Sequence, residues 1–279
     1  MSYTYKEIVG ILSESGIGDA EVEATLLICR FCNVSRATIL ADRQKKWESE
    51  ALDAAIKRRR ERYPLQYILG EWDFFGCSFC VSEGCLIPRP DTEILVEETL
   101  KILPVGAVIC DLCTGSGCIA VSILKARPDV RAVAVELSDD ALNIAEQNAQ
   151  RNGVADRFIP LHADVLNGGE DALKSLMNKE NITSFAAVVS NPPYIPTEVI
   201  STLEPELFFE PKMALDGGAD GLVFYRNIIQ NYAVFVSDGG YMLFEIGADQ
   251  ADGVCALCDK NTDVIRDLGG NDRVVKITF

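Results

Sequence analysis

Short apolar segments alternate with amphipathic segments along most of the chain. From residue 91 onward, runs of apolar and β-branched residues predict strands, and the stretches between them have helical spacing. The predicted strands are 107–112, 131–137, 157–162, 185–191, 240–247 and 273–279, and the predicted helices are 117–126, 138–152, 169–178, 221–236 and 248–259. This alternation is typical of βαβ units around a mostly parallel sheet, in which ligands bind beyond the carboxyl ends of the strands.

The residues before this region have a different pattern. Helices are predicted at Tyr5–Leu12, at Glu21–Phe31 with Asp19 as its cap, from Ser35, and from Trp47 to Arg62 ahead of Pro64. Aromatic and β-branched residues interrupted by glycines at 66–87 predict a β-hairpin. We therefore expect a helical domain at 1–64, a β-hairpin linker at 65–90 and a larger α/β domain at 91–279.

Charge separates these parts further. The chain has 279 residues, of which 48% are hydrophobic and 24% charged, the composition of a globular protein. Its 26 basic and 42 acidic residues give a net charge of −16, which argues against a nonspecific nucleic-acid binder. Residues 1–62 are nearly neutral, with 11 basic and 10 acidic side chains, and eight of the basic residues lie between Arg43 and Arg62.

The sequence contains neither a membrane-spanning apolar segment nor a secretory signal, and it has ten cysteines. Thiols in this context predict a cytoplasmic protein without a membrane partner. Four C-x-x-C pairs are spaced irregularly, and three of them fall in predicted helices or strands, so we expect small hydrophobic side chains rather than a metal site. The single histidine, His162, leaves little scope for histidine-based catalysis.

A glycine-rich loop follows the predicted strand 107–112. It runs Asp111, Leu112, Cys113, Thr114, Gly115, Ser116, Gly117 and then opens a predicted helix. Glycines here allow a sharp turn and a close approach to a ligand at a helix N-terminus. The loop also fits G-x-G-x-x-A, so a nicotinamide cofactor remains an alternative. Asp111 lies four residues before the first glycine. This D-x-x-x-G-x-G arrangement is the one found in S-adenosylmethionine binders, and it favours that cofactor instead.

Two further acidic residues end the next predicted strands. Glu136 is placed to accept hydrogen bonds from the ribose hydroxyls of an adenosine cofactor. Asp164, followed by Val165, could accept from an adenine amino group.

The most specific motif is Asn191-Pro192-Pro193-Tyr194, which follows the predicted strand 185–191. Two prolines fix an extended turn and supply no N–H groups, so the local polar groups are mainly acceptors, namely the Asn191 side chain and the Pro192 carbonyl. Two acceptors suit an NH₂ group, which has two donors, and Tyr194 suits stacking on a planar group.

The loop and the N-P-P-Y turn together resemble those of class I S-adenosylmethionine-dependent methyltransferases that act on a planar amide or amine nitrogen. Three more stretches resemble the HemK/PrmC protein-(glutamine-N5) methyltransferases: Pro64–Ile68, Leu86–Glu93 (L-I-P-R-P-D-T-E) and Glu245–Gly247. The resemblance covers residues from about 64 to the C-terminus. It implies a Rossmann-like fold with a seven-stranded sheet and an N-terminal helical domain that recognises the substrate.

The resemblance also implies a substrate and residue roles. The family methylates the glutamine of the Gly-Gly-Gln motif in bacterial class I peptide-chain release factors, by direct in-line transfer. Asp111, the Cys113–Gly117 loop, Glu136, the Asp164–Val165 turn and Asn191 would bind S-adenosylmethionine, and Asn191–Tyr194 would hold the glutamine amide. The family usually has glycine where Cys113 stands and often aspartate where Glu136 stands, so we expect Cys113 to adopt a backbone conformation that tolerates a Cβ atom.

Other functions share these motifs. A sister enzyme could methylate a glutamine of a ribosomal protein, and N-P-P-Y also occurs in adenine-N6 methyltransferases that flip a base out. The acidic charge beyond residue 62 and the lack of an obvious target-recognition domain count against the latter. The basic run Lys57–Arg62 is either a solvated helix end or a docking surface for an acidic face of a protein substrate.

Overall fold

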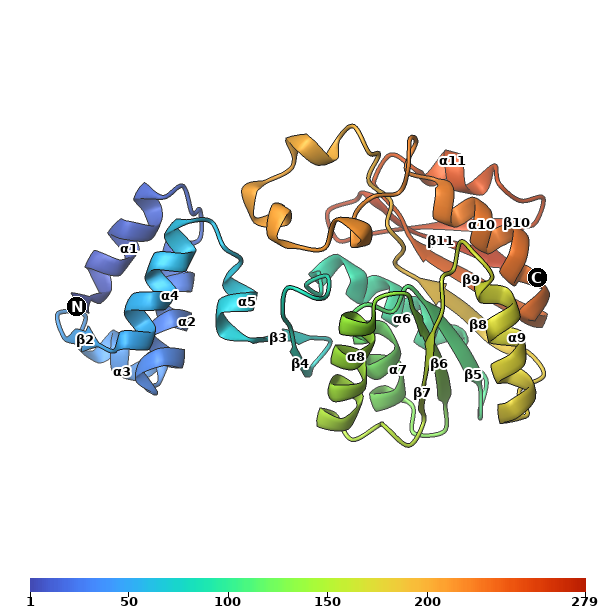
Figure 1. Ribbon diagram of the computed structural model, residues 1–279, viewed down its shortest axis with the longest axis horizontal. Coiled ribbons are helices and arrows are strands. Elements are labelled where there is room, and N and C mark those ends of the chain that lie inside the picture. The colour runs from blue at the N-terminus through green and yellow to red at the C-terminus, as the bar shows by residue number, and fades with distance from the viewer. The chain divides into compact units, whose positions relative to one another are not determined.

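The computed structural model describes all 279 residues, and the chain forms two compact units (Figure 1). The N-terminal unit comprises Met1–Glu71 together with Glu204–Phe209, and the sheet unit comprises Trp72–Leu203 and Glu210–Phe279. No helix combines the length and the apolar character that crossing a membrane requires. All ten cysteines are free thiols, and no group of three or more His, Cys, Asp or Glu side chains could hold a metal ion.

The N-terminal unit is mainly helical. Helices α1, α2 and α4 contact one another through fully buried side chains such as Ile8, Leu27 and Leu52. The helices of this unit are α1 (Tyr5–Glu14), α2 (Ala20–Cys32), α3 (Arg36–Ala41), α4 (Glu50–Arg60), α5 (Leu65–Leu69) and the 3₁₀ helix η3 (Pro205–Phe209).

The sequence pattern predicted that a helix begins at Trp47, but Trp47 lies in a strand. Strands β1 (Ser2–Thr4) and β2 (Lys46–Glu48) pair antiparallel with Tyr3 opposite Trp47. Trp47 is only 3% exposed, because it belongs to the core of the unit. Helix α4 starts later, at Glu50, where the Ser49 hydroxyl accepts a hydrogen bond from the backbone N–H of Leu52.

Two other local predictions need correction. Asp19 occupies the N-cap position of α2, but its side chain accepts no hydrogen bond from the helix. The segment predicted as strand from residue 66 begins instead with helix α5, which Gly70 ends in the left-handed conformation at φ 72°. The hairpin itself is confined to β3 (Glu71–Phe74) and β4 (Cys77–Cys80).

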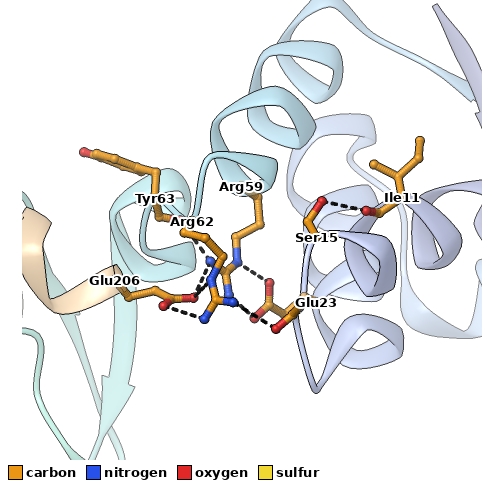
Figure 2. A network of polar contacts seen from close by, with 8 residues as sticks. Ile11, Ser15, Glu23, Arg59, Arg62, Tyr63 and Glu206 are labelled. Atoms are coloured by element: carbon orange, nitrogen blue, oxygen red, sulfur yellow. Dashed lines mark hydrogen bonds and ion pairs between the residues drawn. The ribbon is translucent and has the colours of Figure 1, made fainter. Parts of the chain in front are cut away.

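Arg59 and Arg62 bind an acidic side chain from a distant part of the sequence (Figure 2). Arg59 is 5% exposed; its Nε and Nη2 donate to the two oxygens of Glu23 at 2.6 and 3.0 Å, and its Nη1 donates to Glu206 at 2.9 Å. Arg62 donates to both oxygens of Glu206, with two bonds of 2.7 Å. Paired arginine–carboxylate bonds of this kind are strong and directional. They hold segment 204–209 on the N-terminal unit.

This network changes the interpretation of the basic run Lys57–Arg62. Arg59 is buried within its ion pairs, and the guanidinium of Arg58 lies 3.6 Å from the centre of the Tyr63 ring. Lys57 and Arg60 are exposed. Part of the positive charge thus holds the unit together.

The sheet unit is built on one seven-stranded sheet. Its strand order is β10-β11-β9-β8-β5-β6-β7, and β11 runs antiparallel to both of its neighbours, while the pairs from β9 to β7 are parallel. The strands are β5 (Val108–Leu112), β6 (Arg131–Glu136), β7 (Phe158–His162), β8 (Phe185–Ser190), β9 (Val236–Glu245), β10 (Asn261–Arg266) and β11 (Asp272–Thr278). The expected fold class is confirmed. The apolar runs had not indicated β10, whose residues are mostly exposed at the sheet edge.

Helices cover both faces of this sheet (Figure 1). Successive residues of a strand face opposite sides, so Ile109 belongs to one core cluster and Cys110 to the other. One face carries α6 (Glu93–Ile102), α7 (Cys118–Ala126) and α8 (Asp139–Arg151), and the other carries α9 (Gly169–Glu180), α10 (Val223–Tyr232) and α11 (Ala251–Cys255). Short 3₁₀ helices are η1 (Pro90–Thr92), η2 (Ile200–Thr202), η4 (Lys212–Ala214) and η5 (Ala233–Phe235).

Helix α11 is shorter than the predicted 248–259. Gln250 precedes it, and the Gln250 side chain accepts from the backbone N–H of Gly247 at 2.9 Å and donates to the Tyr194 carbonyl at 2.9 Å. Residues 247–250 therefore form a turn that is bonded to the segment after β8, and the helix begins only at Ala251.

The strand order reverses between β5 and β8. These strands are parallel neighbours, with Leu112 opposite Ser190, and the Ser190 hydroxyl donates to the Leu112 carbonyl at 2.6 Å. The glycine loop after β5 and the N-P-P-Y turn after β8 thus leave the sheet side by side. Such a reversal point is where open α/β sheets bind ligands.

The ion pairs of Arg59 generate a stability prediction for the N-terminal unit. Glu23→Gln should lower the free energy of unfolding by about 2–4 kcal/mol, because it removes the charge partner of a buried guanidinium. Urea unfolding measures the change. The matched control is Glu21→Gln, an exposed acid in the first turn of the same helix, with an expected loss below about 1 kcal/mol. Equal losses for the two variants would contradict this role of Arg59.

Candidate active site

A cavity of about 190 Å³ opens at the carboxyl ends of the parallel strands. Its walls come from the turns after β5, β6, β7 and β8, and from two segments outside the sheet. The main lining stretches are 84–89, 113–116, 136–138, 163–166 and 211–214, together with Thr92, Asn191 and Pro193.

The glycine loop is held in a compact turn. Cys113, Gly115 and Gly117 have φ values of 59°, 57° and 78°, all in the left-handed region. Cys113 therefore occupies a glycine-like conformation, contrary to the expectation that it would adopt one suited to a Cβ atom, and this conformation costs about 1–2 kcal/mol. At Gly117 a Cβ would lie 3.0 Å from the Cβ of Ala145, so the close approach of helix α8 requires glycine.

Asp111 lies beneath this loop with no exposure to solvent. One carboxylate oxygen accepts from the Thr114 hydroxyl at 2.6 Å and from the backbone N–H of Ala120 at 3.3 Å. The other oxygen, Oδ1, is buried without a hydrogen-bond partner. Burial raises the pKa of Asp111 to about 7, although both hydrogen bonds act in the opposite direction. Asp111 does not line the cavity, so in this structure it acts on the site by holding the glycine loop from beneath.

Glu136 connects two strand ends through its carboxylate. Oε2 accepts from the backbone N–H of Gly115 at 2.9 Å, and Oε1 accepts from Leu137 and Ser138 at 2.9 and 3.0 Å. A carboxylate has about four acceptor positions, so these three bonds leave room for one more. Glu136 thus shapes the loop as well as lining the cavity.

Asp164 is held in a tight turn next to Val165. Its Oδ1 accepts from the backbone N–H of Leu166 at 2.8 Å, and its Oδ2 accepts from the Asn167 side chain at 2.8 Å. Both Asp164 and Val165 line the cavity.

The N-P-P-Y turn presents its residues in different directions. Asn191 and Pro193 line the cavity, whereas Pro192 is buried and Tyr194 is turned away, with its hydroxyl 3.5 Å from Glu245 Oε1. The Asn191 amide nitrogen donates to the Thr92 hydroxyl at 3.2 Å. Thr92 thus takes one of the two NH₂ hydrogens of Asn191, and the Asn191 oxygen accepts no hydrogen bond from the protein.

Comparison with known proteins bears on this arrangement. A family model described as the PrmC N-terminal domain matches residues 4–70, and one described as the methyltransferase small domain matches residues 90–232. Release factor glutamine methyltransferases of Geobacter sulfurreducens and Caulobacter vibrioides are 38% and 37% identical to the chain; each alignment covers 95% of this chain, and 92% and 91% of theirs. The chain belongs to the release factor glutamine methyltransferase family.

Further comparisons agree with this assignment. The relative from Clostridium botulinum is 36% identical over 96% of this chain and 95% of its own. Among solved structures, the hMettl16 catalytic domain in complex with MAT2A 3′UTR hairpin 6 matches 82% of each chain with a TM-score of 0.55 and 14% identity, a likeness of fold alone. The protein is thus an S-adenosylmethionine-dependent methyltransferase, as the resemblance of its motifs predicted, and the nicotinamide alternative was wrong.

The residues present fit S-adenosylmethionine. The glycine loop, at 113–116, forms one wall of the cavity, and the buried Asp111 beneath it keeps an acceptor, Oδ1, without a hydrogen-bond partner. Glu136 has one acceptor position left, and the Asp164–Val165 turn forms the adjoining wall.

Several residues of the site carried no individual signal in the sequence. Glu210 is 5% exposed; it accepts from the backbone N–H of Ile87 at 2.9 Å and pairs with Arg89, so it fixes a wall of the cavity. Asn148 of α8 is fully buried and donates to the carbonyls of Cys80 and Ser116 at 3.1 and 2.9 Å. An acid or an amide far away in sequence has no periodicity that reveals such contacts. The family resemblance points only to the L-I-P-R-P-D-T-E stretch, which contains Ile87 and Arg89.

The strain at the glycine loop predicts a cost for Gly117→Ala. We expect a loss of unfolding free energy about 1–3 kcal/mol larger than for Gly153→Ala, because only Gly117 faces a close neighbour. Gly153 is the matched control, since its φ of 71° is similar and nothing lies within 4 Å of its Cβ position. Urea unfolding and calorimetric titration with S-adenosylmethionine test the pair, and cofactor affinity should fall for Gly117→Ala alone.

The buried Asp111 predicts a pH dependence of stability. Its pKa is raised from 3.8 to about 7 on folding, so its contribution is fully present below pH 3.8 and is lost as the pH rises toward 7. Ligand-free wild type should therefore lose more unfolding free energy than Asp111→Asn over this range, by more than about 1 kcal/mol. Denaturant titrations of the two proteins at several pH values measure the difference. Parallel pH profiles would show that the Asp111 carboxylate is not destabilised by burial.

Proposed function

We propose that this enzyme methylates the side-chain amide nitrogen, N5, of the glutamine in the Gly-Gly-Gln motif of bacterial class I peptide-chain release factors. The observation that carries the proposal is that Asn191, whose amide nitrogen is bonded to Thr92, lines the same cavity as the glycine loop. Relatives that are 36–38% identical over nearly the whole chain bear the name release factor glutamine methyltransferase, which supports this substrate.

The N-P-P-Y turn suits a primary amide. The NH₂ group of glutamine offers two donors, and we assign their acceptors to the Asn191 side-chain oxygen and the Pro192 carbonyl. Two bonds would fix the orientation of the nitrogen and stabilise the positive charge that develops on it. Because Pro192 and Pro193 have no N–H, the turn offers no competing backbone donor from these residues.

No strong base is needed at the reacting nitrogen. S-Adenosylmethionine, when bound, supplies an electrophilic methyl group that is transferred directly and in line. Burial raises the pKa of Tyr194 to about 12, so its hydroxyl stays neutral and serves as a donor to Glu245. His162 is exposed and does not line the cavity. The chain's contribution is thus positioning and fixed dipoles, and the amide proton leaves to solvent after transfer.

Substrate recognition is assigned to the helical residues 1–64, joined through the linker 65–90 to the methyltransferase domain 91–279. The partners in this proposal are release factors, without direct nucleic-acid or membrane contact, and the setting is the cytoplasm. The exposed Lys57 and Arg60 remain available for an acidic protein surface.

The proposal predicts the behaviour of Asn191→Ala. Methylation of a release factor should fall by roughly 100-fold or more in kcat, since an aligned acceptor is lost, while cofactor affinity should fall far less because most of the expected cofactor contacts come from other residues. Transfer of tritium from labelled S-adenosylmethionine measures the rate, and mass spectrometry of the Gly-Gly-Gln peptide locates the methyl group. The control is Asn178→Ala, an exposed asparagine of α9. Label in a ribosomal protein or in DNA, but none in the release factor, would contradict the proposed substrate.

A further inference from the structure

The side chain of Asn191 has two ends of nearly equal shape. Its oxygen accepts hydrogen bonds and its NH₂ group donates them, so rotation by half a turn would convert an acceptor site into a donor site. An acceptor facing the cavity suits the NH₂ of glutamine, whereas a donor would suit a carboxylate. Some neighbour must decide which end faces the substrate.

The neighbour in contact with the NH₂ end is Thr92, which also lines the cavity. The Thr92 hydroxyl oxygen accepts a hydrogen bond from Asn191 Nδ2 at 3.2 Å. Thr92 is the last residue of η1 and is 2% exposed. A threonine hydroxyl has one donor and two acceptor positions, so by itself it could also donate to the Asn191 oxygen and stabilise the opposite orientation.

Glu245, which is 1% exposed, biases that choice. Burial raises the pKa of Glu245 to about 7, and hydrogen bonding by Thr92 acts in the opposite direction by favouring the charged form. In its charged form Glu245 only accepts, so the single O–H of Thr92 then turns toward Glu245 and leaves its lone pairs to Asn191. The sheet fixes this neighbourhood, because Phe244 pairs with Ser190 and places Glu245 beside the start of the N-P-P-Y turn.

The carboxylate binds the turn at a second point. The Tyr194 hydroxyl lies 3.5 Å from Glu245 Oε1, whereas Glu245 Oε2 is buried and has no hydrogen-bond partner. Arg273 attracts the carboxylate, and Asp91 repels it. Asn191 through Thr92, and Tyr194 directly, thus depend on one buried acceptor.

We infer that Thr92 is a positioning residue that, with Glu245 behind it, keeps the oxygen of Asn191 toward the cavity and thereby selects an amide over a carboxylate. The inference rests on the proposed function, since it explains why glutamine and not glutamate would be accepted. A glutamate side chain would bring acceptors against the Asn191 oxygen. Leaving such polar groups unpaired or opposed is what gives hydrogen-bonding sites their discrimination.

The test compares Thr92→Val, which removes the hydroxyl at constant shape, with Thr92→Ser, which keeps it. With a release factor as substrate, Thr92→Val should lower kcat about 10- to 100-fold, while the KM for S-adenosylmethionine stays unchanged. Thr92→Ser should recover most of the rate. The matched control is Thr99→Val, which removes another fully buried hydroxyl from the following helix, one that donates to the Leu95 carbonyl at 2.7 Å.

A binding measurement distinguishes positioning from a merely structural role, because a structural role would not change the preference for glutamine over glutamate. The release factor and its variant with glutamate in place of the motif glutamine are titrated into the enzyme loaded with S-adenosylhomocysteine. Wild type and Thr99→Val should prefer the glutamine form, and Thr92→Val should reduce this preference about tenfold, the size of one lost hydrogen bond. Glu245→Gln should shift the preference in the same direction, and this variant replaces Thr92→Val in the test if Thr92→Val does not fold.

The outcomes separate the two claims. If wild type methylates the release factor but Thr92→Val keeps the wild-type rate and preference, the role of Thr92 is wrong and the proposed function stands. Equal losses for Thr92→Ser and Thr92→Val would also overturn it, because the hydroxyl would then be irrelevant. If wild type neither binds nor methylates the release factor, both the proposed function and the inference fail.

Discussion

The parallel pairing of β5 with β8 is the constraint on which the site depends. It aligns Leu112 with Ser190, so two loops separated by more than seventy residues of sequence leave the sheet together. One is the glycine loop and the other is the N-P-P-Y turn, to which we assign the cofactor and the amide. The order in which successive strands are added to the sheet reverses at this point, which is where open α/β sheets leave a crevice for ligands.

Buried carboxylates hold these loops from below. Asp111 supports the glycine loop, Glu210 ties the Ile87–Arg89 wall, and Glu245 lies behind the N-P-P-Y turn. Burial raises the pKa of Asp111 and of Glu245 to about 7, so each is held at a cost in folding energy. Buried groups of this kind are commonly kept where a precise arrangement matters more than stability.

The segment after the N-P-P-Y turn is held in a different way. Glu206 bonds Arg59 and Arg62 of the N-terminal unit, and Glu210, four residues later, bonds the sheet unit. Two acids in one short segment therefore belong to two different units. Arg59 and Arg62 of the basic run serve this attachment, whereas Lys57 and Arg60 are exposed.

The sequence by itself determined the alternating α/β architecture, the glycine loop and the N-P-P-Y turn, because these depend on local periodicity and on the backbone limits of Gly and Pro. It misjudged Trp47 and residues 66–69, where pairing with β1 and a left-handed stop at Gly70 outweigh local propensity. Only the tertiary structure decided that Thr92 and Glu245 lie behind Asn191, and that Glu206 joins Arg59. Hydrogen bonds between residues 99 and 147 positions apart leave no periodic trace, because the register of the sheet and the fold of the loops bring them together.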